Sequence, residues 1–334
     1  MAILDDLLKF IAQYQMLISK QETKAARDLA KRYKAMYARI APQVEALAEQ
    51  IAAGEMTAAE VRKLKSLAAL ETAIQEEFTA FSGYLRTEIN PLAVSAAGIG
   101  AEYAYTVMRY LTGGRDINQL SPNNIEALLR FLSPGSALYE RISKLAGYHT
   151  ESVIQAILDS VGRGLGPRQV AREIMAAAEG AFGGGLVDAL RMERTAQLWA
   201  SRAAAHANYI ANNDIVTGWI WIAELDETTC MSCVSLHGQR FDLDEVQDDH
   251  HNGRCTSIPE IMGQNPIEGL ASGSDWFSNL TEEQQQAMMG PGKYEAWKDG
   301  KFDISQLSRQ NPDDVYGHMR GEVPLKDLVN GEEA

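Results

Sequence analysis

Cysteine, positive charge and long apolar runs are all scarce in this sequence of 334 residues. The cysteines are three in number and crowded together, which excludes the disulfide framework of a small secreted protein. No apolar stretch approaches the roughly 18 residues that span a bilayer, and no signal-peptide pattern stands at the N-terminus. We therefore expect a protein that is made and kept in the cytoplasm, with no membrane contact.

Positive charge is scarce because 31 basic residues face 45 acidic ones, which gives a formal net charge of -14. Such a surface repels nucleic acid as a whole, so any contact with DNA must be local. One local basic stripe recurs at helical spacing: Lys20, Lys24, Arg27, Lys31 and Lys34. Two interpretations stay open, a solvated face opposite an apolar line from Leu29 to Ile51, or a contact with DNA phosphates or an acidic partner.

Helical periodicity dominates the first half of the chain. It predicts a long helix over residues 4–53, in which Pro42 is a candidate kink or break. Thr57 with Glu60 has the form of a capping box and predicts a second helix over 57–89, ended by Asn90-Pro91. Shorter helices are expected at about 95–112, 122–132, 136–147, 150–162 and 167–179.

After a glycine-rich segment at 180–185, interpreted as a loop, an alanine-rich helix is expected over 186–211. The period then changes, because "VTGWIWIAELD" is β-branched and aromatic and suits a strand. Trp219 and Trp221 are expected on the core face of that strand. His237-Gly238 predicts a turn whose return strand begins near Arg240. Thr281 and Gln284 predict a capped short helix, and the last ~25 residues are expected to be loosely packed.

All the cysteines lie close together in "CMSCVSLHGQ" and "DDHHNGRC", a window that follows the strand on an expected turn. Cys230 and Cys233 have two residues between them, and Cys255 follows His250 and His251. Three thiolates and one imidazole are what tetrahedral zinc takes in a closed structural site. The sequence thus predicts a zinc clamp that folds a loop with little apolar material.

Three other interpretations of this window remain open. One is a redox-active C-x-x-C pair, which normally opens a helix, and another is three free structural thiols. The last is a His-Asn-His-like nuclease, in which "DDHH" supplies a general base and a carboxylate for a divalent metal. That enzyme needs further ligands, for which the chain offers Asn265, Asn279 and His318.

The window and the segments before it resemble the phage Mu F-like minor head proteins, also called phage head morphogenesis proteins. The resemblance rests on motifs in a shared order between residues 150 and 260, namely "GRGLGPRQVAREI", Arg194-Thr195, Gly218-Trp219, "DETTCMSC", "LHG", Phe241 and "HHNGRC".

The chain departs from this pattern at three positions. Ala196 replaces a glutamate, Gly253 replaces the first cysteine of Cys-Arg-Cys, and His251 replaces a proline. The alignment favours His250 as the fourth ligand and leaves His251 as an alternative.

The resemblance implies a virion component without catalytic residues, present inside the head and associated with the portal. We expect a mainly α fold with a small α+β zinc-clamp domain that contains a short β-hairpin or small sheet. The expected domains are a helical region at 1–149, a Mu F-like domain at 150–260 and a polar extension at 261–334. Expected partners are the portal protein, the major capsid or scaffolding protein, and packaged DNA through the basic stripe.

Overall fold

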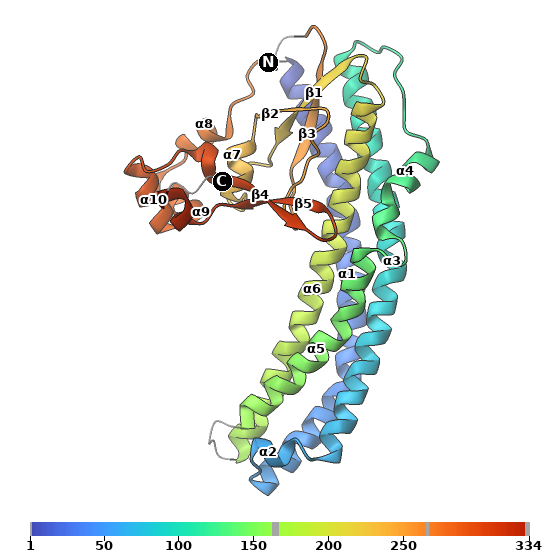
Figure 1. Cartoon of the computed structure of the whole chain (residues 1–334), viewed down its shortest axis with the longest axis vertical. Helices are drawn as coiled ribbons and strands as arrows, with labels where there is room; N and C mark the ends of the chain where they lie inside the picture. The colour runs from blue at the N-terminus through green and yellow to red at the C-terminus, as the bar shows by residue number, and fades with distance from the viewer. Residues whose placement is uncertain (1, 162–166, 265–266, 331–334) are drawn as a thin grey trace. The chain divides into compact units, whose positions relative to one another are not determined.

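A computed structural model describes residues 2–161, 167–264 and 267–330 (Figure 1). The chain is mainly helical and carries a small antiparallel sheet, which confirms the expected fold class. No helix in the described part combines the length and the apolar character needed to cross a bilayer.

Three long helices run without the breaks expected at proline and glycine. Helix α1 (Ala2–Gly54) continues through Pro42, α3 (Lys65–Leu111) through Pro91, and α6 (Pro167–Ile210) through the glycine-rich segment at 180–185. Likewise, α5 (Ala137–Val161) joins two helices expected as separate; residue 162, where the second was expected to end, lies outside the described residues. The expected loop at 180–185 and the expected end at Pro91 are therefore wrong.

Burial explains why these helices continue. On either side of Pro91, Ile89 and Ala93 are fully buried, so the apolar face extends across the proline. Burying that face outweighs a proline penalty of about 3 kcal/mol. Within the glycine-rich segment, a Cβ at Gly185 would lie 2.5 Å from the hydroxyl oxygen of Tyr33. This glycine serves a close approach between helices rather than a turn.

The chain divides into two compact units made of non-contiguous segments. The first comprises residues 1–21, 92–131 and 195–334, and the second comprises 22–91 and 132–194. The boundaries expected at 149/150 and 260/261 describe sequence regions and stay a prediction.

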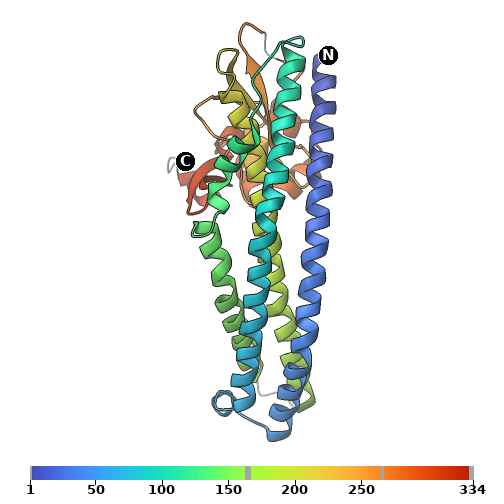
Figure 2. The same ribbon diagram turned by 90° about the vertical axis from the view of Figure 1, so that its right-hand side faces the viewer.

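The second unit is a bundle of α1, α3, α5 and α6, seen side by side in Figure 1 and in the turned view of Figure 2. Each helix gives one ring to a shared aromatic cluster: Tyr33, Phe78, His149 and Phe182. The short helix α2 (Ala58–Val61) has the expected capping box of Thr57 with Glu60. The apolar line expected along α1 is buried from Leu29 to Ile51, so it forms part of this core.

The first unit contains the sheet. Strands β1 (Val216–Ile222), β2 (Arg240–Asp242) and β3 (Thr256–Ile261) pair antiparallel in the order β2-β1-β3. One face packs on α1, α3 and α6, through residues such as Tyr14, Tyr103 and Leu198. The other face carries Trp219 and Trp221, in the core as expected, together with Cys233 and Cys255.

Helix α7 (Met231–Leu236) lies between β1 and β2, and Gly238, at φ 83°, begins the turn into the return strand. Between α3 and α5 come α4 (Pro122–Leu128), capped by Ser121, and the 3-10 helix η1 (Leu129–Leu132).

The C-terminal segment is more ordered than expected. It contains α8 (Gly273–Ser278), α9 (Glu282–Met289) with its Thr281 capping box, α10 (Pro291–Lys298) and the 3-10 helix η2 (Ile304–Leu307). A hairpin of β4 (Ser308–Asp313) and β5 (Gly317–Glu322) and helix α11 (Leu325–Asn330) follow.

These elements share a core with α7 that includes Val323 and Leu328. The expectation of a loose tail over the last ~25 residues is wrong for their described part, because Val323 and Leu328 pack against α7 and η2. Residues 331–334 lie outside the described part.

Candidate metal centre

The first two cysteines lie at the start of a helix. Cys230 is the N-cap of α7, and its sulfur accepts the backbone N–H of Cys233 at 3.4 Å. The C-x-x-C segment therefore opens a short helix, which corrects the expectation of a turn. One helical turn places both sulfurs on the same side, where they face the loop between β2 and β3.

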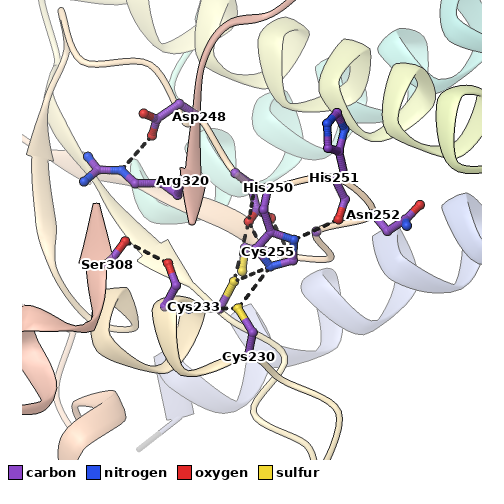
Figure 3. Close-up of polar contacts among 12 residues, drawn as sticks. Cys230, Cys233, Asp248, His250, His251, Asn252, Cys255, Ser308 and Arg320 are labelled. Atoms are coloured by element: carbon purple, nitrogen blue, oxygen red, sulfur yellow. Dashed lines mark hydrogen bonds and ion pairs between the residues drawn. The ribbon is translucent and has the colours of Figure 1, made fainter. Parts of the chain in front are cut away.

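That loop brings His250 onto the two sulfurs (Figure 3). Its Nε2 lies 3.1 Å from Sγ of Cys230 and 3.1 Å from Sγ of Cys233. Its other nitrogen, Nδ1, lies 2.8 Å from the carbonyl oxygen of His251, to which it donates if it carries the proton. A second hydrogen bond of this kind is typical of metal-binding histidines, because it fixes the ring and leaves the facing nitrogen free to ligate.

Cys255 completes the expected set of donor residues, but through a second group of atoms. Cys233, Asp249 and Cys255 offer donor atoms within 4.8 Å of one another, as do Cys230, Cys233 and His250. The two groups share Cys233. The four expected zinc ligands thus fall into two groups joined at Cys233, and Asp249, which was not among those ligands, belongs to the second group.

His251 lies outside this cluster. Its ring points away from the sulfurs in Figure 3, and its Nε2 lies 3.9 Å from a carboxylate oxygen of Asp313 on β4. The ring also meets Tyr316 at 6.3 Å. Of the two candidate histidines, the geometry favours His250.

The connection from β2 to β3, residues 243–255, is called the ligand loop because it carries His250 and Cys255. Asp249 in this loop is fully buried and fixes its backbone. Its Oδ1 accepts the backbone N–H of His250 at 2.8 Å, and its Oδ2 accepts that of Cys255 at 3.2 Å. Nη1 of Arg202, on α6, lies 3.4 Å from Oδ2 and donates to the carbonyl oxygen of Gly253 at 2.8 Å. One carboxylate therefore fixes the backbone at two ligand positions and connects the loop to a buried guanidinium.

Gly253 makes room for that carboxylate. A Cβ at this position would lie 2.1 Å from Oδ2 of Asp249, which no side chain tolerates. The glycine that departs from the Mu F-like pattern is thus coupled to the aspartate just before His250. This pairing is the signal by which the sequence could have indicated Asp249.

Two further contacts brace the site from outside. Arg254 makes a two-pronged ion pair with Asp226, whose carboxylate also accepts the N–H of Thr228, and Arg254 holds the pKa of Asp226 well below its usual range. On the other side, Asp248 accepts Nε of Arg320 at 3.0 Å and Nε2 of Gln310 at 2.6 Å. Hairpin β4–β5 therefore holds Asp248, the loop residue that directly precedes Asp249, by two hydrogen bonds.

The ionisable groups of the cluster are strongly coupled. A hydrogen bond from Cys233 and the proximity of His250 lower the pKa of Cys230 to about 5. The same bond to Cys230 raises the pKa of Cys233, and burial raises that of Cys255. Burial lowers the pKa of His250, but Cys230 and Asp249 outweigh it and raise the value to about 9. Without a metal, protons thus occupy positions that a cation would take, so metal binding must release them.

The donor set suits a structural zinc ion by its chemistry and by one unpaired donor nearby. Cys233 and Cys255 are buried, and sulfur with imidazole is the ligand type of closed zinc sites. The buried indole Nε1 of Trp221 has no hydrogen-bond partner of ordinary geometry in the described part of the chain. The indole nevertheless lies near Cys255: burial raises the pKa of the Cys255 thiol, and the proximity of Trp221 partly offsets that rise. A thiolate at Cys255 would accept this N–H.

The remaining candidate residues lie elsewhere. All members of the basic stripe are exposed along α1. Of the residues that a nuclease would need, Asn279 donates to the carbonyl oxygen of Asp275 at 2.9 Å, His318 is exposed on β5, and Asn265 lies outside the described residues. The structure therefore brings neither Asn279 nor His318 to His250 as a ligand.

Comparison with known families adds the decisive observation. Residues 151–258 match the model of the phage Mu protein F like family. Over this segment the chain is similar to that family. The matched Mu F-like region contains the end of α5, α6, the cysteines, the ligand loop and nearly all of the sheet. The family is one of structural phage head proteins and indicates a role in phage head morphogenesis. No curated protein and no solved structure matches the chain.

Proposed function

We propose that this chain is a minor capsid protein of a tailed phage, located inside the head at the portal. There it would serve head assembly, DNA packaging or DNA ejection. The observation that carries the proposal is the Mu F-like match over the segment that contains the Cys/His cluster. Cys233, Cys255 and Asp249 are buried, Cys230 and His250 are half-buried, and Asp249 fixes the backbone of the loop that carries His250 and Cys255, as in a structural site.

A structural zinc ion is part of this proposal. Cys230, Cys233, His250 and Cys255 would hold it, and Asp249 would keep the loop in position by binding the backbone. When bound, zinc supplies a cross-link between α7 and the ligand loop. The carbonyl oxygen of His251 orients the imidazole, and the unpaired indole N–H of Trp221 would be available to a thiolate at Cys255.

Partner contacts follow from the exposed faces of the chain. The basic stripe on α1 is a candidate surface for packaged DNA or for an acidic face of a portal or scaffolding protein. With a net charge of -14, the rest of the chain disfavours anionic partners, so a contact here would depend on these few side chains and weaken with salt.

The direct experiment is co-expression with the portal protein encoded in the same phage genome. We expect the two proteins to purify together through a tag on either one and to remain associated after size-exclusion chromatography. The complex should survive replacement of the exposed Val187 by aspartate, a control in the bundle. If the portal protein elutes alone under conditions in which both are folded, the location proposed here is wrong.

The competing function is a metal-dependent nuclease. Its test is phosphodiesterase activity of the purified chain on phage DNA with magnesium or manganese. A structural protein predicts no cleavage above that of a His250→Ala variant. Cleavage by the parent that disappears in this variant, with the fold retained by circular dichroism, would replace our proposal with the enzyme.

A further inference from the structure

A pocket beside the ligand loop offers a binding site that the head-protein function does not use. It lies within the first unit, between α6 and the ligand loop, and its volume is about 290 Å³. Its walls are mostly apolar: Ala203, Ala207 and Ile210 come from α6, and Leu243 and Val246 come from the ligand loop. Such a lining is usual in pockets for small ligands, and the volume suits a single ring or branched aliphatic group.

Aromatic rings and exposed aliphatic groups extend this apolar surface to solvent. Trp199 and Tyr316 both line the pocket, and their ring centroids lie 5.9 Å apart. Val246, on the ligand loop, is 60% exposed, and Ile210, on α6, is 47% exposed. Exposed apolar groups that adjoin a cavity, rather than lying singly, mark a place where an apolar body gains by leaving water.

The charges around the pocket favour a cation over an anion. Arg202 lines the pocket but is buried and paired with Asp249, and Asp248, also in the lining, is buried and paired with Arg320. Each of these pairs is neutral in formal charge. Asp244 completes the charged lining; it is exposed and makes no ion pair in the part of the chain that the structure describes. The pocket therefore carries a net negative charge, in a chain whose own net charge is -14.

The buried polar groups of the lining do not change this balance. Nε2 of His206 lies 3.0 Å from the carbonyl oxygen of Leu243, and burial lowers the pKa of this histidine, which leaves the ring neutral near pH 7. Nε and Nη2 of Arg202 and Oε1 of Gln247 have no hydrogen-bond partner among the described residues, but all three atoms are buried and are not offered to a ligand. Among the charged groups of the lining, Asp244 is the one that stands in solvent.

We propose that this pocket binds an apolar group that carries a cation on a short linker, with an aryl-alkyl ammonium ion as the simplest case. The ring would lie in the cavity against Trp199 and Ala207, and the ammonium would stay in solvent beside Asp244. A carboxylate in that place would face a like charge. Two sources share this chemistry, namely a free aryl-alkyl amine and the N-terminus of a polypeptide whose first residue is aromatic. The proposal is independent of the portal assignment.

The walls should supply most of the affinity and the charge a smaller part. A ring of indole size that leaves water here should bind with a dissociation constant of about 1 mM. An ion pair with an exposed carboxylate adds little, so an ammonium should bind only about threefold more tightly than an uncharged analogue. This preference should disappear at about 1 M salt, whereas binding of the ring should not.

The test uses the full zinc-loaded chain and a ligand-observed NMR titration with matched probes. Tryptamine represents the free amine, tryptophol its uncharged control and indole-3-acetate the anion; Trp-Ala-Ala amide represents the chain start, and its N-acetylated form the control. We expect at least one ammonium probe to bind about threefold more tightly than its control, and tryptamine about tenfold more tightly than indole-3-acetate. Preference for tryptamine alone indicates a free amine as the ligand, and preference for the peptide alone indicates a chain start.

Two variants locate the binding. Ala207→Leu keeps a helix-forming residue on α6 and fills the cavity, so it should weaken every bound probe by about tenfold, whereas Ala12→Leu, at an exposed alanine of α1, should leave them unchanged. Asp244→Asn should abolish the preference for ammonium and keep the binding of tryptophol. Its matched control is Asp28→Asn, at an exposed aspartate of the other unit.

Three results would overturn the proposal. They are the absence of any ammonium probe that binds below about 10 mM, equal binding of ammonium probes and controls at low salt, and an unchanged affinity in Ala207→Leu. Because Asp244 is exposed, its variant should fold even if Ala207→Leu does not, and an unchanged ammonium preference in Asp244→Asn is then the result that counts against the site.

Discussion

Gly253 is the position near the site where a single added methyl group should do most damage. An ideal Cβ there would lie 2.1 Å from Oδ2 and 2.2 Å from Cγ of Asp249. The φ of Gly253 lies outside the left-handed region, so an alanine would bring no backbone strain of its own. The effect of Gly253→Ala therefore reports only on the displaced carboxylate.

The magnitude follows from the bonds that the carboxylate makes. Displacing it would break its hydrogen bonds from the N–H groups of His250 and Cys255, at 2.8 and 3.2 Å. Hydrogen bonds to a charged group contribute about 1.5–3 kcal/mol each, so Gly253→Ala should lower the free energy of unfolding by about 3–6 kcal/mol. Asp249→Ala removes the same bonds and leaves the buried Arg202 without its carboxylate partner. It should lower the free energy of unfolding by about 3–5 kcal/mol.

The double variant separates this reasoning from general damage. With alanine at 249 there is no carboxylate to displace, so adding Gly253→Ala should cost less than about 1 kcal/mol more, a coupling of about 3 kcal/mol. Urea unfolding of the zinc-loaded chain measures all three. Gly98→Ala in α3, where a Cβ meets nothing within 4 Å, is the control and should be neutral or slightly stabilising. Additive costs, or a harmless Gly253→Ala, would refute the role given to Asp249.

Three further predictions concern other parts of the chain. Gly185→Ala should lower the melting temperature of the bundle, because its Cβ would lie 2.5 Å from a tyrosine oxygen, whereas Gly184→Ala meets nothing within 4 Å and should raise it slightly; equal shifts would contradict the close-packing argument. Burial, with a neighbouring carboxylate, raises the pKa of Glu193 to about 8, so the native state holds a proton that the unfolded state releases above about pH 4. The free energy of unfolding should therefore fall between about pH 4 and 8, and Glu193→Gln should remove that dependence and be the more stable by about 2–4 kcal/mol at pH 8; a parallel pH profile would count against it. Trp221→Phe should weaken zinc binding about tenfold in a chelator competition, because the N–H that faces Cys255 is lost; unchanged affinity would show that the indole plays no part.

Local signals in the sequence were sufficient for several elements. The capping boxes at Thr57 and Thr281, the Ser121 cap and the strand at Val216 all rest on interactions within a few residues, and each is confirmed. Such features depend on backbone donors close in sequence, so they can be predicted without knowing the tertiary structure.

The long helices could not be delimited in the same way. Pro91 and the glycines at 180–185 are local breakers, but they lie on helices whose apolar faces are buried on both sides of them. Gly185 is needed because Tyr33 and His149 approach it from helices far away in the sequence. Tertiary packing overrode local propensity at each of these positions.

The candidate site divides along the same line. The cysteines and His250 were predicted from their spacing and from the family resemblance, and the structure places them in two donor groups that share Cys233. Asp249 and Arg202 were not predicted, because their pairing joins a loop to a helix 47 positions away in the chain. The ion pair itself leaves no local pattern in the sequence; only the glycine at 253, in place of the family's cysteine, marks the space that Asp249 fills.

The most direct test of the central claim is the zinc content of the purified chain, measured by native mass spectrometry and by elemental analysis. We expect about one zinc ion per chain in the parent and in His251→Ala. Cys230→Ser and His250→Ala should each lose the metal and show increased proteolysis of the segment 226–256. A parent that folds fully without zinc, or a variant series in which His251→Ala loses the metal and His250→Ala keeps it, would contradict the clamp described here.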